Sequence, residues 1–206
     1  MYDIDVVLNP IEHVLFTDEQ LDAIYSNHEI TIRTADTKYT YALINDNIPA
    51  LHLGHKFILL EYNKVYESLP SKVIKARNTE QLFMTHALFD NEAKLVTCIG
   101  KAGSGKTFLT LYAGIHLVEQ QKFNKILLVV KPMHISSKDR IGYLPGDLSN
   151  KLNPYVQAVV DNLNVLYNNK IPDDLKDLFD SSIIEVVALD FLRGRTFHDA
   201  FVIIDE

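Results

Sequence analysis

The feature that most constrains the fold of this chain is a glycine-rich segment with the sequence Gly100-Lys101-Ala102-Gly103-Ser104-Gly105-Lys106-Thr107. The apolar residues before it predict a strand over Lys94–Ile99, and apolar residues at helical spacing after it predict a helix over Lys106–Gln121. A strand, a glycine-rich turn and a helix in this order match G-x-x-x-x-G-K-[ST], the Walker A pattern of a phosphate-binding loop. An ordinary glycine-rich turn is the alternative interpretation.

The residue types of this loop suit the phosphates of a nucleotide. Its three glycines allow positive φ and close backbone approach, and successive N–H groups can form a nest for an anion at a helix N-terminus. Lys106 supplies a positive charge for the β and γ phosphates, and the Thr107 hydroxyl can ligate Mg²⁺. The expected nucleotide-binding residues of the loop are Gly100, Lys101, Ala102, Gly103, Ser104, Gly105, Lys106, Thr107 and Phe108.

A second motif lies at the end of the sequence, where the apolar residues 201–204 lead into Asp205 and Glu206. A buried strand that ends in a carboxylate suits the coordination sphere of Mg²⁺, which we expect Asp205 to join through water. Glu206 can act as the general base that polarises the attacking water. Thr107 and Asp205 are thus the expected metal residues, and Lys106 and Glu206 the expected catalytic residues of an ATP hydrolase. A small-molecule kinase does not need this acidic pair, which disfavours that alternative.

Residues 1–70 are typical of a small β-rich domain. Thr17, with Gln20 three residues later, predicts a capping box at the start of a helix over Asp18–Tyr25. The expected strands are Glu29–Thr34, Lys38–Ile44 and Lys56–Tyr62. Ser68-Leu69-Pro70-Ser71 then predicts a boundary, which gives domains of residues 1–70 and 71–206.

Predicted helices and strands alternate in residues 71–206. The expected helices are Glu80–Phe89, with Thr79 as N-cap, Pro154–Tyr167 and Pro172–Phe179, and the expected strands after the loop helix are Lys125–Val130, Ile183–Ala188 and Ala200–Asp205. This alternation predicts a parallel sheet with right-handed crossovers, and hence an α/β domain.

Composition limits the classes of function. The net charge of −7 and the pI of about 5.6 argue against a globally basic protein that wraps nucleic acid, although a local basic groove is compatible with them. The single cysteine, Cys98, excludes an internal disulfide. The tyrosines and phenylalanines are scattered and indicate no aromatic platform of the kind that single-strand-binding proteins use. No signal peptide or long apolar segment is visible, so we expect a cytoplasmic protein that does not enter a membrane.

Several motifs together resemble the PhoH-like P-loop ATPases. The resemblance covers residues 71–206, and the stretch Gly142-Tyr143-Leu144-Pro145-Gly146-Asp147 is specific because it is not a general P-loop feature. The other shared segments are Arg77–Gln81, Ile99–Thr107, Lys151–Pro154, Arg193–Arg195 and Val202–Glu206. The resemblance implies a RecA-like core similar to that of superfamily 1 helicases, with ATP and Mg²⁺ as ligands. Some members of the family are associated with RNA unwinding or cleavage.

The resemblance also implies roles for four residues outside the two motifs. Gln81 takes the position at which such helicases read adenine. Lys131 ends a strand at which related helicases contact the nucleic-acid backbone. Arg193 and Arg195 take positions that suit contact with RNA or with a phosphate bound to a neighbouring subunit. The alternatives are a solvent-facing helix residue for Gln81, a solvated side chain for Lys131 and loop capping for the two arginines. ATP, RNA and a second copy of the chain are therefore the expected partners.

Two departures from the family pattern change the expected activity and the expected extent of the core. Residues 1–70 do not resemble a PIN-type nuclease domain and show no acidic set for a two-metal nuclease, so nuclease activity is not expected. Members of the family continue after the acidic pair with a strand that lies between the phosphate-loop strand and the Asp-Glu strand. We therefore expect a core that is incomplete at its C-terminus, with a gap in the sheet, in a fragment of a longer protein. The alternative function is a nucleotide-dependent binding module without turnover.

Overall fold

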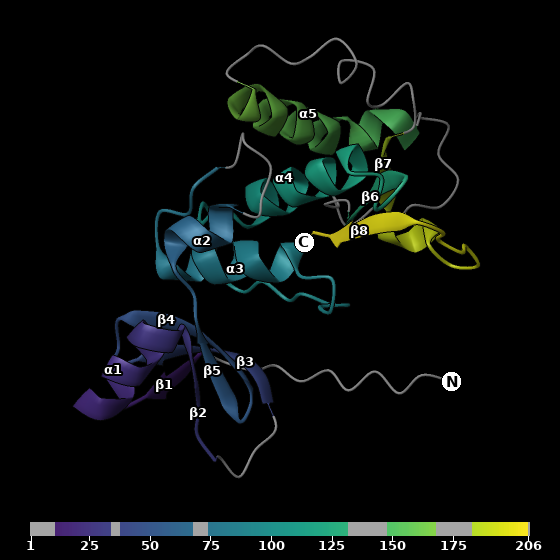
Figure 1. Cartoon of the computed structure of the whole chain (residues 1–206). Coiled ribbons are helices and arrows are strands. Elements are labelled where there is room, and N and C mark those ends of the chain that lie inside the picture. The colour runs from purple at the N-terminus through teal and green to yellow at the C-terminus, as the bar shows by residue number, and fades with distance from the viewer. Residues whose placement is uncertain (1–10, 34–37, 68–73, 132–147, 168–182, 206) are drawn as a thin grey trace. The chain divides into compact units, whose positions relative to one another are not determined.

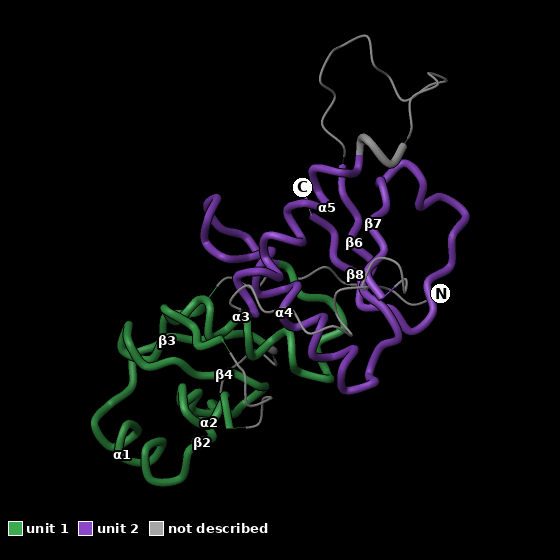
Figure 2. Tube along the Cα trace, turned by 90° about the horizontal axis from the view of Figure 1, so that it is seen from above, with its two compact units in different colours: residues 1–97 green, residues 98–206 purple. Residues whose placement is uncertain are grey.

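The structure is a computed structural model that describes residues 11–33, 38–67, 74–131, 148–167 and 183–205. The chain divides into two compact units, residues 1–97 (unit 1) and 98–206 (unit 2), which Figure 2 shows in green and purple. The division of the chain into domains of residues 1–70 and 71–206 stays a prediction.

Unit 1 is built on a five-stranded sheet with the order β1-β3-β4-β5-β2. β1 pairs with β3 in parallel, and the other neighbours are antiparallel. The elements are β1 (Glu12–Val14), α1 (Asp18–Asn27), β2 (Glu29–Thr31), β3 (Lys38–Ile44), β4 (Ile48–Gly54), β5 (Lys56–Leu59), α2 (Tyr62–Glu67) and α3 (Thr79–Phe89). The predicted β-rich character of the N-terminal region is confirmed.

The start of α1 has the predicted capping box. The Thr17 side chain accepts from the Gln20 N–H, and the Gln20 side chain accepts from the Thr17 N–H at 2.9 Å. Phe16 and Leu21 flank this cap and pack into the same apolar cluster, as a hydrophobic staple does. Local chemistry therefore fixes both the first residue of the helix and the direction in which the chain enters it.

The hairpin between β3 and β4 explains the strand that sequence analysis missed. Asn45 and Asp46 both have positive φ (49° and 63°), as a type I′ turn requires. The pattern indicated a turn here but not the strand Ile48–Gly54 that follows it, because Pro49 near its start argues against a strand. Pro49 instead pairs with Leu43, and its carbonyl accepts from the Leu60 N–H at 2.9 Å.

Both faces of the unit 1 sheet carry helices. On one face, Ile24 of α1 packs with Ile44 and Phe57, and on the other, Leu82 and Phe83 of α3 pack with strand residues such as Leu51. The predicted ends of two strands were wrong by a few residues: β2 stops at Thr31, and β5 stops at Leu59, so that Tyr62 begins α2 instead of ending a strand. α1 runs two residues past the predicted Tyr25.

The N-cap of α3 is Asn78, not the predicted Thr79. The Asn78 side chain accepts from the Gln81 N–H at 2.9 Å, and Thr79 is the first helical residue. Asparagine is among the best N-cap residues, ranking above threonine. The helix therefore starts one residue earlier than the sequence analysis placed it.

Unit 2 is a three-stranded parallel sheet with the order β7-β6-β8. Figure 1 shows α4 and α5 side by side over one face of this sheet, and a cluster that includes Leu111, Val159 and Ile126 joins the two helices to the strands. The elements are α4 (Lys106–Glu119), β6 (Lys125–Val130), α5 (Leu148–Leu166), β7 (Ile184–Ala188), the 3₁₀ turn η1 (Leu189–Phe191) and β8 (Ala200–Ile204). The predicted α/β class with a parallel sheet is confirmed.

A glycine allows α4 to lie close to the sheet. A Cβ atom on Gly114 would come within 2.9 Å of Phe201 Cδ1 and 3.2 Å of Ile126. Such distances leave no room for a side chain. Gly114 in the middle of the helix therefore weakens helix propensity but permits the contact between α4 and β8.

The predicted strand over Lys94–Ile99 is absent. Residues 95–99 have no regular structure, and Leu95 and Ile99 are 64% and 85% exposed. A strand needs a neighbouring strand to pair with, and among the described residues β8 pairs with β6 alone. Within the described residues β8 is therefore an edge strand of the unit 2 sheet, and the phosphate-loop strand that was expected on the far side of the gap does not form.

Two further differences concern helices after the phosphate loop. α4 ends at Glu119, two residues before the predicted end, and α5 begins at Leu148 instead of Pro154, which lies inside the helix. The predicted helix Pro172–Phe179 lies outside the described residues. In the part of the chain that the structure describes, no helix has the length and apolar character needed to cross a bilayer. The expected cytoplasmic location stays a prediction.

Candidate nucleotide site

The glycine-rich segment forms a tight loop that leads directly into α4. Gly103 and Gly105 have positive φ, 75° and 91°, in the region that only glycine enters at little cost. Gly100 has a different requirement, because a Cβ there would come within 3.0 Å of Ser104 Oγ. Two glycines of the loop thus use the positive φ that the sequence analysis considered, and Gly100 does not.

The Lys106 side chain folds back across the loop. Its Nζ donates to the carbonyl oxygens of Gly100 at 2.8 Å and Lys101 at 3.1 Å. The Ser104 N–H donates to the Lys101 carbonyl at 3.2 Å and tightens the same turn. The ammonium group therefore lies on the loop itself, the place where it can balance the charge of a bound phosphate.

The sheet brings Asp205 to the loop from the other end of the sequence. Asp205 follows β8, its N–H donates to the Val129 carbonyl at 2.9 Å, and its Oδ2 accepts from Thr107 Oγ1 at 3.0 Å. The predicted metal residues Thr107 and Asp205 are thus in contact.

This pair of oxygens fits a magnesium ion. Hydroxyl and carboxylate oxygens are the donors that Mg²⁺ prefers. The hydrogen bond of 3.0 Å from Thr107 Oγ1 to Asp205 Oδ2 holds the carboxylate beside the hydroxyl, where it can reach the ion through a bound water. Glu206, the predicted general base, lies outside the described residues, so its position is not part of this argument.

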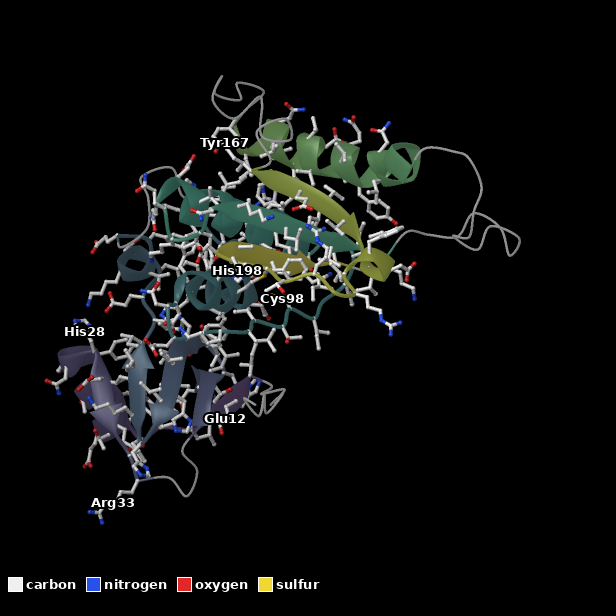
Figure 3. The ribbon with its side chains drawn as sticks, turned by 90° about the vertical axis from the view of Figure 1, so that its right-hand side faces the viewer. Glu12, His28, Arg33, Cys98, Tyr167 and His198 are labelled. Atoms are coloured by element: carbon white, nitrogen blue, oxygen red, sulfur yellow. The ribbon has the colours of Figure 1, made fainter. Side chains whose placement is uncertain are left out.

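Cys98 lies on the segment that enters the loop, and Figure 3 labels it. Burial raises the pKa of its thiol, and the nearby Lys106 ammonium offsets only part of this effect. The thiol therefore stays protonated at neutral pH and is a poor nucleophile. A protonated, half-buried thiol of this kind acts as a small packing residue.

Comparison with known proteins identifies the family. Residues 73–206 match the family described as PhoH, PhoH-like protein, and this stretch is well over half of the chain. The chain belongs to the PhoH-like family. It is therefore a nucleotide-binding P-loop protein, with the phosphate loop and the Thr107–Asp205 contact described above inside the matched region.

Relatives of this PhoH-like chain come from several bacteria. It is 34% identical to Protein PhoH2 of Bacillus subtilis in an alignment of 202 positions that covers 93% of this chain and 46% of that protein. It is 36% identical to Protein PhoH2 of Mycolicibacterium smegmatis over 65% of this chain and 30% of that protein. A PhoH-like protein of Bacillus subtilis is 32% identical over 78% of this chain and 50% of that protein. The chain thus spans about half or less of the length of these relatives.

The structure separates the two arginines that the sequence analysis grouped together. Arg195 donates to Glu185 Oε1 at 2.6 Å and lies over the Phe197 ring at 5.6 Å. Glu185 precedes Ala188, the last residue of β7, by three positions, about 10 Å back along the strand. Both arginine side chains are exposed, but Arg195 is held on Glu185, away from the sheet edge that carries Asp205.

The structure gives contacts for Lys131 and Gln81, the two other residues to which the family resemblance assigns roles. Lys131 follows β6, its side chain is exposed, and its carbonyl accepts from the Tyr155 hydroxyl at 3.0 Å, a contact that no sequence pattern indicated. Gln81 lies in the first turn of α3, where its Oε1 accepts from the Arg77 N–H at 2.8 Å. Gln81 belongs to unit 1 and the phosphate loop to unit 2, so its role in reading adenine stays a prediction.

Proposed function

We propose that this chain binds ATP with Mg²⁺ at the phosphate loop and that the whole protein hydrolyses ATP in a cycle coupled to RNA. The contact between Thr107 Oγ1 and Asp205 Oδ2 at 3.0 Å is the main support. It joins the hydroxyl of the phosphate loop to the carboxylate that follows β8, the two protein groups that hold Mg²⁺ in P-loop hydrolases. β8 is not the buried strand that the sequence predicted, since Val202 and Ile204 on one of its faces are exposed.

Each residue has a defined task in this proposal. Lys106 moves its ammonium from the loop carbonyls to the β and γ phosphates, and Gly103 and Gly105 keep the loop N–H groups turned toward the anion. Thr107 and Asp205 hold Mg²⁺, which neutralises charge on the phosphates when bound. Glu206 acts as the general base for the attacking water. A second copy of the chain and a role for Gln81 at the adenine remain expectations from the family resemblance.

Replacement of Lys106 tests the binding site. Lys106→Ala should weaken binding of a fluorescent N-methylanthraniloyl ATP by more than 100-fold, because a charge-assisted contact to phosphate is lost. Lys94→Ala, an exposed lysine whose Nζ donates to the Asn91 carbonyl, is the control and should bind as the wild type does. Wild-type affinity in Lys106→Ala would show that the site is misassigned.

Phosphate release separates hydrolysis from the alternative of a binding module without turnover. Both interpretations use the same nucleotide site, so ATP affinity alone does not distinguish them. In the whole protein, Glu206→Gln should keep ATP binding and lose phosphate release, with and without RNA. Absence of phosphate release from the wild-type whole protein under all these conditions would favour the binding module.

A further inference from the structure

Three chain segments leave the parallel sheet of unit 2 at the same edge. Val129 is paired with Ile204, and Val130 with Ala188, so β6, β7 and β8 end together. Asp205 follows β8, Lys131 follows β6 and η1 follows β7. The carboxyl edge of a parallel sheet is where open α/β folds bind their ligands, and here it extends from the Mg²⁺ residues across Lys131 to η1.

The η1 turn places apolar side chains in solvent. Leu189 and Phe191 are each 45% exposed. Among the phenylalanines and tyrosines that the structure describes in unit 2, Phe191 is the exposed one, and the others are largely buried. Exposed apolar groups beside a functional edge favour an interaction site.

Positive charge flanks this turn on both sides. Val130 and Ala188 are paired, so Lys131, the residue after β6, lies beside Leu189, the residue after β7. On the other side of the turn, Arg193 follows Phe191 by two residues. Both side chains are exposed. The Tyr155 hydroxyl holds the Lys131 carbonyl at 3.0 Å and so fixes the backbone from which the lysine extends. Asp190, between Leu189 and Phe191, is the opposing charge at this turn.

We propose that Phe191 stacks on a base of single-stranded RNA while Lys131 and Arg193 contact its phosphates. An exposed ring between two cations combines the stacking surface and the charge that single-strand binding requires, whereas the bases of a duplex are already stacked. This inference rests on the RNA coupling in the proposed function and assigns its contact surface. Arg195 is not part of this surface, since Glu185 holds it.

The test is binding of the intact chain to a 5′-fluorescein-labelled 15-nucleotide oligouridylate, followed by fluorescence anisotropy. Phe191→Ala should weaken binding about tenfold, as loss of one stacked base does, and Phe191→Tyr should restore it. Tyr25→Ala, which removes an aromatic ring that is 54% exposed in unit 1, is the matched control and should leave binding unchanged. Urea unfolding of Phe191→Ala should keep the wild-type midpoint.

Salt dependence tests the two cations separately from the ring. Lys131→Ala and Arg193→Ala should each reduce the slope of log affinity against log salt concentration by about 0.7, the value for one phosphate contact on a single strand. Phe191→Ala should leave this slope unchanged. Equal slopes for the wild type and both cation variants would overturn the phosphate contacts.

A parallel titration with fluorescent ATP distinguishes this inference from the proposed function. ATP binding that survives in Phe191→Ala while RNA binding weakens supports the RNA contact. Wild-type RNA binding by Phe191→Ala, or no RNA binding by the wild type, overturns it without affecting the ATP site. If Phe191→Ala loses ATP affinity instead, the ring contacts the nucleotide and the RNA contact is wrong. Loss of ATP binding by the wild type itself would refute the proposed function alone.

Discussion

Upstream of the phosphate loop, residues 95–99 have no regular structure, and Leu95 and Ile99 are 64% and 85% exposed. Downstream, α4 is a regular helix in which Leu111 is fully buried and Ile115 is 3% exposed. Both segments have an apolar sequence that predicts regular structure. The difference shows that a helix supplies its own hydrogen bonds, whereas a strand depends on a partner strand.

The same contrast applies to the candidate site. The residues that depend on α4 and β8, Lys106, Thr107 and Asp205, have defined contacts within unit 2. Residues 95–99, which enter the loop, belong to no helix or strand that could hold them in the same way. The downstream side of the loop therefore positions the phosphate-binding groups, and the following predictions test how far this asymmetry extends.

The largest expected effect on stability comes from a comparison of two leucine-to-alanine variants, one on each side of the loop. Leu111→Ala should lower the free energy of unfolding by about 2–5 kcal/mol, since it leaves a cavity among buried side chains. Leu95→Ala should change it by less than about 0.5 kcal/mol, because that side chain is exposed. Urea unfolding followed by circular dichroism measures both. Similar losses for the two variants would show that the upstream segment is packed in solution.

A second substitution tests the close approach of α4 to the sheet. Gly114→Val should cost about 1–3 kcal/mol, because its side chain overlaps Phe201 and Ile126, although valine is the better helix former. Ala158→Val places the same side chain at an exposed position of α5 and should cost less than about 1 kcal/mol. If Gly114→Val proves as stable as the wild type in urea, α4 does not need a glycine at this contact.

A substitution within the phosphate loop should have a smaller effect on stability. Gly103→Ala puts a Cβ on a residue with φ of 75° and nothing within 4 Å, so its cost is backbone strain of about 1–2 kcal/mol. The free loop can relax this strain, and ATP binding should weaken about three- to tenfold. Gly54→Ala, with φ of 63° and equally open surroundings in unit 1, is the control. It should lower stability but not ATP affinity, and an equal loss of affinity in both would contradict a local effect.

The smallest effect is expected from the ion pairs of Glu185. The hydrogen bond from Arg195, opposed by burial and helped by Lys125, lowers the pKa of this carboxyl below its ordinary value. The pair therefore stabilises the fold at neutral pH, and that stability is lost as the pH falls below the ordinary carboxyl value of 4.5 and through the lowered pKa of Glu185.

The variant Glu185→Gln measures this contribution. It should be less stable than the wild type by under about 1 kcal/mol at pH 7, as is usual for exposed pairs, and the difference should shrink as the pH falls below the ordinary carboxyl value of 4.5. Glu92→Gln, an exposed glutamate outside regular structure, serves as the control. A stability difference that persists unchanged at low pH would exclude the ionised carboxylate as its cause.

Local chemistry made several elements predictable. The capping box at Thr17 and Gln20 predicted the first residue of α1. Apolar residues at helical spacing predicted α4, and a continuous apolar run predicted β6, and both elements have nearly the predicted bounds. The candidate site followed from two motifs because each residue type in them has a specific chemical task. The strand Ile48–Gly54 was missed because Pro49 argued against it and its partners lie elsewhere in the chain.

The sequence by itself determined the phosphate loop, the α/β class, the PhoH-like membership and the acidic end of β8. Only the tertiary structure brought Asp205 to Thr107, held Arg195 on Glu185 and exposed Phe191 beside Lys131. Motifs and caps are encoded by neighbouring residues, so they can be identified from short segments. Contacts across a sheet and the exposure of a side chain depend on which distant segments pack together, and for residues 95–99 the lack of a paired strand outweighed their own apolar pattern.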